Sequence, residues 1–320
     1  MKRDKIIIDT DCGIDDAIAI KVASHYFGKN LIAITVVAGN VPIEKAGENV
    51  CRLLPLFNEN YKNIPIYLGS GKPLRGKLFP FAFEYHSSDG LGGLSGKIDK
   101  IIGSYKINAS KISAIEAMAD IVRKEKSNSL RLITIGPLTN IAKAILKYPD
   151  IMKRIKEIII MGGSFYYPGN ITPLAEFNVY CDPYAASVVF SSEIPIRVLG
   201  LNITERVFFK KNEVERCFKD AKGQIGKVLK ELLLRHIKLH RRAEKFEGAF
   251  QHDPVAVVAA LKPNLFWWER RNVNIIVENK ELKGMTYADF RRKSIRSGNT
   301  LIAVDLDIEA VKKVIIEGIQ

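Results

Sequence analysis

The sequence is poor in cysteine, and its four cysteines lie far apart. Cys12, Cys51, Cys181 and Cys217 form no C-x-x-C pair among the 320 residues. Structural zinc sites usually draw on closely spaced cysteines, so this spacing argues against a zinc centre. In a cytosolic protein such cysteines are usually reduced and partly buried, and we expect that state here.

Long apolar runs are also missing. No run approaches the roughly 18–20 residues that a membrane span requires, so we expect no membrane segment. The N-terminus leads directly into the first apolar stretch, which leaves no room for a signal peptide. We therefore expect a cytoplasmic protein.

Internal repeats, low-complexity tracts and linkers are absent, which favours a single domain over residues 1–320. The formal net charge is +14, from 49 basic and 35 acidic residues. The basic residues are scattered and accompany no recognised nucleic-acid motif. Solvated helix faces explain them better than a nucleic-acid partner does.

Apolar, β-like runs alternate with helical patterns along most of the chain. This alternation is typical of a parallel sheet with right-handed crossovers. We expect an α/β fold with an open, mostly parallel, Rossmann-like sheet flanked by helices, and a more helical C-terminal part. The expected strands are 6–8, 31–37, 64–68, 130–135, 158–161, 196–199, 272–277 and 300–304, and the expected helices include 42–56, 109–124, 225–242 and one from about 308.

Residues 9–16 have the sequence DTDCGIDD, which places four aspartates directly after a buried strand. Neighbouring carboxylates raise one another's pKa and resist joint ionisation. A helix N-terminus offsets only roughly 0.3–1 kcal/mol per favourable charge, and helix capping explains at most two of the four. A hard divalent cation with oxygen ligands, Ca²⁺ or Mg²⁺, accounts for the group better.

Other polar residues follow later predicted strands, among them Asn40, Asn140 and Asn178. Because the carboxyl ends of parallel strands share one edge of the sheet, we expect these side chains to converge on the aspartates. His252 and Asp253 stand at a predicted helix start. Asp253 could simply cap that helix, and His252 could be a structural histidine.

The sequence resembles the nucleoside hydrolase family of the inosine-uridine-preferring type. Residues 9–16 match its N-terminal DxDxGxDD signature. The similarity continues in order through VAGN at 37–40, His86 with DGLG at 89–92, GPLTN at 136–140, MGG at 161–163, AEFN at 175–178 and HDP at 252–254. The resemblance implies hydrolysis of the N-glycosidic bond of ribonucleosides to ribose and free base, in nucleoside salvage, with a tightly bound Ca²⁺.

The resemblance also implies roles for single residues. The metal ligands would be Asp11, Asp16, Asp253 and the main-chain carbonyl of Ile135. The substrate contacts would be Asp15, Asn40, His86, Met161, Asn170, Glu176, Asn178 and His240. A threonine is often found where Ile135 stands, but a main-chain ligand does not depend on the side chain. The family forms dimers and tetramers, so we expect a homo-oligomer.

The chemistry asks for such groups independently. Breaking an N-glycosidic bond builds oxocarbenium character on the ribose, which requires nearby negative charge, a nucleophilic water and stabilisation of the leaving base. Ca²⁺ acidifies water less than zinc does, so a carboxylate must take the proton, and Asp11 is the candidate base. His252 is the candidate proton donor to the leaving base. Its HDP element resembles the nonspecific and pyrimidine-preferring branches more than the purine-specific one.

Two alternatives remain at this point. A phosphatase of the haloacid dehalogenase type also begins with a strand and a DxD motif, which would make Asp9 the nucleophile with Mg²⁺. That class needs a later acidic pair after a strand, and the run at 158–161 ends in glycines instead. A non-catalytic nucleoside- or RNA-binding module would bind without turnover, but an acidic crevice repels a phosphate backbone.

Overall fold

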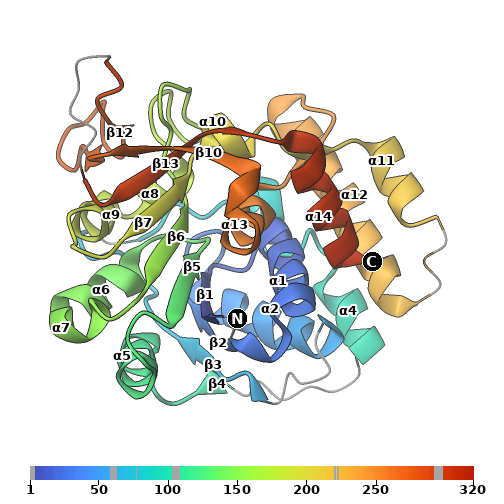
Figure 1. The fold of residues 1–320 in the computed structure, drawn as a ribbon. Coiled ribbons are helices and arrows are strands. Elements are labelled where there is room, and N and C mark those ends of the chain that lie inside the picture. The colour runs from blue at the N-terminus through green and yellow to red at the C-terminus, as the bar shows by residue number, and fades with distance from the viewer. Residues whose placement is uncertain are drawn as a thin grey trace.

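The computed structural model describes residues 4–57, 63–76, 78–102, 109–219, 221, 223–291 and 298–320. Within them, nine strands form one sheet in the order β10-β13-β7-β6-β5-β1-β2-β3-β4 (Figure 1). Neighbouring strands run parallel except β10 and β13, which are antiparallel. The strands are β1 (Lys5–Thr10), β2 (Leu31–Val36), β3 (Ile66–Leu68), β4 (Ala109–Ser110), β5 (Leu130–Thr134), β6 (Glu157–Met161), β7 (Ile196–Leu199), β10 (Phe266–Arg271) and β13 (Thr300–Leu306).

Two apolar cores cover the two faces of this sheet, because side chains alternate between faces along each strand. In β1, Ile6 and Ile8 belong to one core and Ile7 to the other. The first core includes residues of α1 (Ile14–Phe27), α2 (Ile43–Phe57), α4 (Ser95–Ile102), α11 (Lys211–Cys217), α12 (Gln224–Glu244), α13 (His252–Leu261) and α14 (Ile308–Ile319). The second includes residues of α5 (Ala114–Lys124), α6 (Thr139–Lys147), α7 (Pro149–Met152) and α9 (Pro183–Phe190). This confirms the predicted α/β sheet flanked by helices, with a more helical C-terminal part.

Short elements connect these layers. The helices among them are α3 (Phe83–His86), α8 (Phe177–Cys181) and α10 (Leu201–Thr204), with 3-10 turns at Gly28–Asn30 and Pro263–Leu265. Two small antiparallel pairs join β8 (Phe208–Phe209) to β9 (Ala249–Phe250) and β11 (Asn274–Ile275) to β12 (Thr286–Tyr287).

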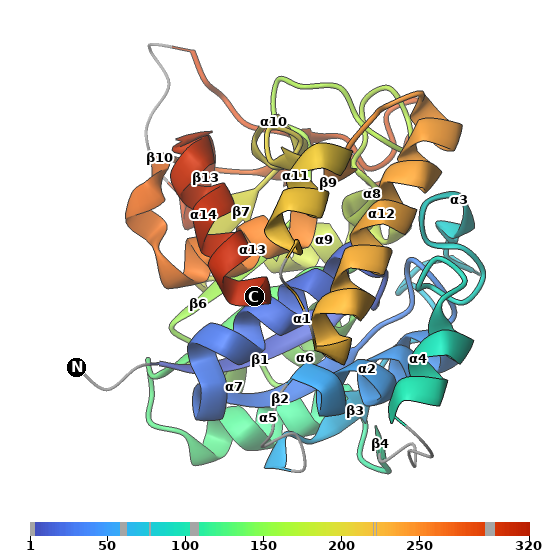
Figure 2. The ribbon, with the colours of Figure 1, turned by 90° about the vertical axis from the view of Figure 1, so that its right-hand side faces the viewer.

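Two helices bring residues from the C-terminal part of the chain to the first helix, α1. The helix α13 is buried from Asp253 to Ala260, because it packs between β6 on one side and α1 and α14 on the other. An all-apolar helix suits such a position. The helix α12 is amphipathic, and it packs beside α3 and α1 (Figure 2). Its buried stripe of leucines continues into His236 and His240 near its C-terminal end.

Two predicted elements are partly wrong. The helix expected over 109–124 begins at Ala114, because the hydroxyl of Ser113 accepts the Glu116 N–H at 3.3 Å and caps it there. The two residues Ala109–Ser110 instead form the edge strand β4 beside β3. The strand expected over 64–68 is also shorter and covers Ile66–Leu68.

The strand expected over 272–277 is wrong for the main sheet. Only Asn274–Ile275 of that run is β structure, in the small pair with β12. The edge strand of the main sheet is β10, which ends at Arg271. It carries the exposed side chain of Trp267 and ends in charged residues, so it lacks the continuous apolar run of a central strand. Among the described helices, none is long and apolar enough to span a bilayer.

Candidate active site

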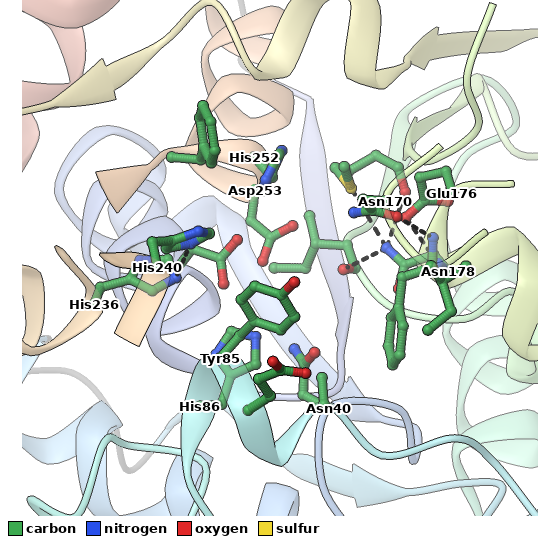
Figure 3. Close-up of a pocket in the computed structure, with 18 of the residues that line it drawn as sticks. Asn40, Tyr85, His86, Asn170, Glu176, Asn178, His236, His240, His252 and Asp253 are labelled. Carbon is green, nitrogen blue, oxygen red and sulfur yellow. Dashed lines mark hydrogen bonds between the residues drawn. The ribbon is translucent and has the colours of Figure 1, made fainter. Parts of the chain in front are cut away.

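A cavity opens at the carboxyl ends of the parallel strands, next to the N-terminus of α1. Its lining comes from the segments that follow β1, β2, β5 and β6, and from α3, α8, α12 and α13. All the site residues predicted from the sequence line this cavity, except Asp11 and Asp16. Figure 3 shows that side chains from distant parts of the chain point toward one another there.

Acidic side chains gather at one end of the cavity. Carboxylate oxygens of Asp15, Asp16 and Asp253 lie within 4.8 Å of one another, and all three residues are buried. Burial, and then the charge of Asp16, raises the pKa of Asp15 to about 8. Burial, and then the charge of Asp15, raises the pKa of Asp253 well above its ordinary value. Without a cation, these carboxylates therefore hold protons at a pH at which exposed aspartates are charged.

Asp11 and Asp16 lie just outside the lining, and the backbone holds them. One oxygen of Asp16 accepts the N–H of Gly13 at 2.8 Å and the side-chain amide of Asn40 at 3.1 Å. The Oδ2 atom of Asp11 accepts the backbone N–H of Asn40 at 2.7 Å. The Oδ1 atom of Asp11 is buried without a hydrogen-bond partner among the described residues. Burial, and then the charge of Asp16, raises the pKa of Asp11 well above its ordinary value.

The turns between strands and helices make this packing possible. The helix α1 begins at Ile14, so Asp15 and Asp16 fall in its first turn. A Cβ on Gly39 would lie 2.1 Å from Oδ2 of Asp11, so only glycine allows the loop after β2 to approach that carboxylate. Asp253 also lies in a first turn, that of α13, whose N-cap is Gln251. The interpretation of Asp253 as a cap is therefore wrong.

A second wall of the cavity carries Glu176 and Asn178. The carboxylate of Glu176 caps α8 by accepting three backbone N–H groups, those of Gly163 at 2.9 Å, Asn178 at 2.7 Å and Val179 at 3.0 Å. The amide of Asn178 donates to the carbonyls of Ile135 at 3.1 Å and Met161 at 3.2 Å, at the ends of β5 and β6. These contacts fix both side chains against the sheet.

Asn170 is held next to that wall. Its Oδ1 atom accepts the backbone N–H of Phe177 at 2.9 Å, one residue after Glu176. The loop that carries Asn170 is thereby tied to the start of α8.

Histidines gather beside the carboxylates and form the histidine end of the cavity, where ring nitrogens of His86 and His236 lie within 4.8 Å of a carboxylate oxygen of Asp15. The chain has five, and His86, His236, His240 and His252 all line the cavity. The fifth, His25, is exposed on α1. Burial, and then the charge of His240, lowers the pKa of His86 and of His252 to about 3. The same causes hold the pKa of His236 well below its ordinary value. These three imidazoles are therefore neutral at pH 7.

The hydrogen bonds of the imidazoles define what they offer. The Nδ1 atom of His86 accepts the backbone N–H of Ile14 at 3.1 Å, so in the neutral ring the proton sits on Nε2. The Nδ1 atom of His252 lies 2.8 Å from the hydroxyl of Thr204. The Nε2 atoms of His236 and His240 lie 3.0 Å apart and share one proton.

Sequence reasoning missed His236, Tyr85 and Glu244. The hydroxyl of Tyr85 on α3 donates to Glu244 on α12 at 2.8 Å, which joins two elements of the cavity wall. The only local signal was the i, i+4 spacing of His236 and His240 on one face of an amphipathic helix.

Asp9 and Asn140 do not face the cavity. The Oδ1 atom of Asp9 accepts the hydroxyl of Thr35 at 2.5 Å and the amide of Asn140 at 2.8 Å. The amide of Asn140 also donates to the Val36 carbonyl at 2.9 Å, and its oxygen accepts the Ser70 N–H at 2.8 Å. This pair ties strands together. Because Oδ1 of Asp9 is occupied by side chains of β2 and α6, this geometry argues against Asp9 as the nucleophile of a phosphatase.

Comparisons with known proteins agree with this geometry. A family model described as "Inosine-uridine preferring nucleoside hydrolase" matches residues 6–313. The chain is 36% identical to a pyrimidine-specific ribonucleoside hydrolase of Klebsiella pneumoniae, over 95% of this chain and 94% of that protein. It is 33% identical to a probable uridine nucleosidase of Oryza sativa, over 85% and 81%.

Solved structures show the same similarity. A plant nucleoside hydrolase superposes with a TM-score of 0.89 at 30% identity, over 99% of this chain and 98% of that one. A purine-preferring ribonucleoside hydrolase from Gardnerella vaginalis superposes with a TM-score of 0.87 at 28% identity, over 98% of each chain.

Proposed function

The chain belongs to the family of inosine-uridine preferring nucleoside hydrolases, and we propose that it is a calcium-dependent enzyme that prefers pyrimidine ribonucleosides. The observation that carries the proposal is that one cavity joins a buried carboxylate cluster to a set of neutral imidazoles. The carboxylates suit a cation and a sugar, and the imidazoles suit a heterocyclic base.

The carboxylate cluster fits a hard divalent cation. The Oδ1 atom of Asp11 is buried without a partner among the described residues, and a buried carboxylate oxygen in that state is costly. The surrounding donors are oxygens, which Ca²⁺ prefers. We propose Asp11, Asp16, Asp253 and the carbonyl of Ile135 as its ligands. When bound, Ca²⁺ supplies a template for water and sugar and a partial activation of that water.

The second wall and the first turn of α1 fit the ribose. We propose that Asp15, Asn40, Glu176 and Asn178 accept and donate hydrogen bonds to the ribose hydroxyls. Glu176 and Asn178 are already fixed by backbone contacts, so little side-chain entropy is lost on binding. Asn170 and Met161 complete that part of the pocket.

Two residues would act on the water and the leaving base. We propose that Asp11 takes a proton from the attacking water, which lets the oxygen add to the anomeric carbon. The carbon–nitrogen bond breaks with its electron pair on the base nitrogen. His252, whose pKa of about 3 leaves the ring neutral, donates an N–H hydrogen bond to that nitrogen, and solvent then supplies the proton. The imidazole of His86 adds a second N–H donor near the base, because its Nδ1 is committed to the Ile14 N–H.

The preference for pyrimidine rests on relatives. The Klebsiella relative is named pyrimidine-specific and the Oryza relative a probable uridine nucleosidase. The purine-preferring structure is less similar in sequence, at 28% identity. These names support uridine and cytidine as the preferred substrates.

The direct test measures release of reducing sugar from uridine, cytidine, inosine, adenosine and guanosine, with and without a chelator. We expect the pyrimidine nucleosides to react fastest, and readdition of Ca²⁺ but not Mg²⁺ to restore chelated enzyme. Faster release from purine nucleosides would overturn the base preference. Activity that survives complete chelation would overturn the metal dependence.

The dimeric or tetrameric state, the cytoplasmic location, and the absence of membrane and nucleic-acid partners stay predictions. The single domain over residues 1–320 also stays a prediction, supported by one sheet that joins strands from Lys5 to Leu306.

A further inference from the structure

Two histidines at the base end of the cavity face each other one helical turn apart. His236 and His240 occupy positions i and i+4 of α12, and both are almost fully buried, with 1% and 4% of their surfaces exposed. Their Nε2 atoms lie 3.0 Å apart (Figure 3). This spacing on one helix face is the one by which paired histidines hold a metal ion.

The distance is close to that of a metal chelate. Imidazole nitrogens bind zinc at about 2.0–2.1 Å with tetrahedral angles, which places two such nitrogens about 3.3–3.4 Å apart. The two Nε2 atoms, now 3.0 Å apart, would therefore need to move apart by only about 0.3–0.4 Å to reach that spacing. A change of this size lies within the freedom of two side-chain rotations.

Glu244 stands where an outer-shell partner of such a site is needed, although Nδ1 of His240 has no hydrogen-bond partner among the described residues. Its Oε2 atom lies 3.6 Å from Nδ1 of His240, and Tyr85 donates to its other oxygen at 2.8 Å. A carboxylate behind a ligating histidine holds the proton on the far nitrogen and turns the lone pair of Nε2 toward the metal. The contact with His240 also lowers the pKa of Glu244, so the carboxylate is charged.

The protons balance without a net release. The hydrogen bond between the two Nε2 atoms contains one proton. In the tautomer that we assign, a second proton sits on Nδ1 of His240, which lies 3.6 Å from Glu244 without a hydrogen bond. The Nδ1 atom of His236 has no hydrogen-bond partner among the described residues. When a metal takes both Nε2 lone pairs, the shared proton moves to Nδ1 of His236. Both ligands are then neutral imidazoles, the form that binds metal.

His86 does not belong to this site. One nitrogen or oxygen each of Asp15, His86 and His236 lie within 4.8 Å of one another. The Nδ1 atom of His86 is committed to a backbone N–H, so its Nε2 carries a proton and has no lone pair for a metal.

We propose that His236 and His240 form a second metal site, selective for Zn²⁺, Cu²⁺ or Ni²⁺, that is distinct from the carboxylate cluster. Imidazole selects these ions, whereas carboxylate oxygens select Ca²⁺ and Mg²⁺. Both histidines line the cavity, so a bound ion occupies the space of the base. Inhibition by the ion is then competitive with nucleoside, and that consequence alone rests on the proposed function.

Binding is tested with Co²⁺, which stands in for zinc, in full-length protein saturated with Ca²⁺. We expect one visible absorption band per chain that Zn²⁺ displaces. His236→Asn and His240→Gln should each weaken Co²⁺ binding by at least about 100-fold, since even an outer-shell change costs 10–100-fold. His25→Gln, which changes an exposed histidine, should bind normally.

Two further variants keep the result decisive. Glu244→Gln should weaken Co²⁺ binding by about 10-fold, because it leaves both ligands in place and removes only the outer-shell charge. Asp253→Asn should leave the absorption band intact. A band that survives both histidine variants, or that disappears in Asp253→Asn, would overturn the proposal.

The activity measurement separates this proposal from the proposed function. With uridine as substrate, Zn²⁺ should raise KM and leave kcat unchanged in unmodified protein, and the effect should vanish in His240→Gln. Inhibition that persists in His240→Gln would contradict the site. If the protein hydrolyses no nucleoside, the proposed function fails, while the Co²⁺ titration still decides the metal site.

Discussion

The two ends of the cavity solve opposite electrostatic problems. At one end, buried carboxylates repel one another and hold protons that a cation would replace. At the histidine end, the buried imidazoles of His86, His236 and His252 are neutral, and each ring makes a hydrogen bond through one of its nitrogens. The difference indicates that the acidic end depends on an ion to complete it, whereas the histidine end is already in the protonation state that a neutral base requires.

The largest effect is expected from Asp11→Ala. The change removes the proposed base and a proposed metal ligand together. We expect kcat for uridine to fall by at least about 10⁴-fold, the upper end of the range for a positioned general base. Circular dichroism should show an intact fold, and reducing-sugar release measures the rate. A variant that keeps near-normal turnover would remove Asp11 from the mechanism.

Removal of calcium should change stability as well as activity, and the change should depend on pH. The raised pKa of Asp15, about 8 against 3.8 for an exposed aspartate, means that the metal-free folded state binds more protons than the unfolded state between these values. The stability of chelated protein therefore falls as the pH rises from about 4 to about 8. Bound Ca²⁺ opposes that fall.

Calorimetry of chelated and Ca²⁺-loaded protein measures this effect. We expect the gain in Tm on adding Ca²⁺ to be larger at pH 8 than at pH 5. A ligand at 100 times its Kd adds about 2.7 kcal/mol to the free energy of unfolding. A gain in Tm that is equal at both pH values would show that calcium does not displace protons from these carboxylates.

The histidine end is tested by the leaving group. His252→Ala should slow uridine hydrolysis by about 10²–10⁴-fold, because the departing base loses the hydrogen-bond donor that stabilises its nitrogen. The leaving group of nitrophenyl riboside is nitrophenolate, which departs as a stable anion without protonation. Hydrolysis of this substrate should therefore slow far less. His25→Ala serves as the matched control and should leave both rates unchanged. An equal loss on both substrates would assign His252 a structural role, with Thr204 as its anchor.

The same contrast explains how much the sequence could predict. The acidic end could be predicted because three of its aspartates lie in one eight-residue stretch directly after a buried strand. The carboxyl end of such a strand is the usual place of a ligand site. The histidine end could not be predicted from the sequence, since α3, α12 and α13 come together at the cavity through tertiary packing. His236 therefore looked like one more residue of an amphipathic helix.

The fold shows a similar limit. The central strands β1, β5 and β6 have continuous apolar runs and were predicted close to their bounds. The bounds of the edge strand β10 were not predicted, because exposed Trp267 and Arg270 interrupt any such run. Central strands are specified by burial on both faces, whereas an edge strand is specified mainly by its partner.

The smallest effect on activity is expected from Asp9→Asn, two residues from Asp11. Asp9 belongs to the same motif, but its Oδ1 atom binds Thr35 and Asn140, and its Oδ2 atom is buried without a partner among the described residues. In Asp9→Asn, the amide oxygen still accepts the hydrogen bonds of Thr35 and Asn140, and the amide nitrogen takes the place of Oδ2, where it finds no acceptor among the described residues. This buried, unpaired N–H group should lower the free energy of unfolding by about 1–3 kcal/mol. The kcat/KM for uridine should change by less than about 10-fold, or 1.36 kcal/mol.

Chemical denaturation and steady-state kinetics on the same preparation separate the two effects. Loss of turnover comparable to that of Asp11→Ala, with unchanged stability, would extend the acidic end to Asp9 and revive the nucleophile interpretation. Loss of stability with retained turnover would place the boundary of the acidic end between Asp9 and Asp11. That boundary is expected because Asp9 is the last β1 residue but one, and its Oδ1 atom binds Thr35 of β2 and Asn140 of α6. Asp11 instead follows the strand and accepts the N–H of Asn40 at the edge of the cavity.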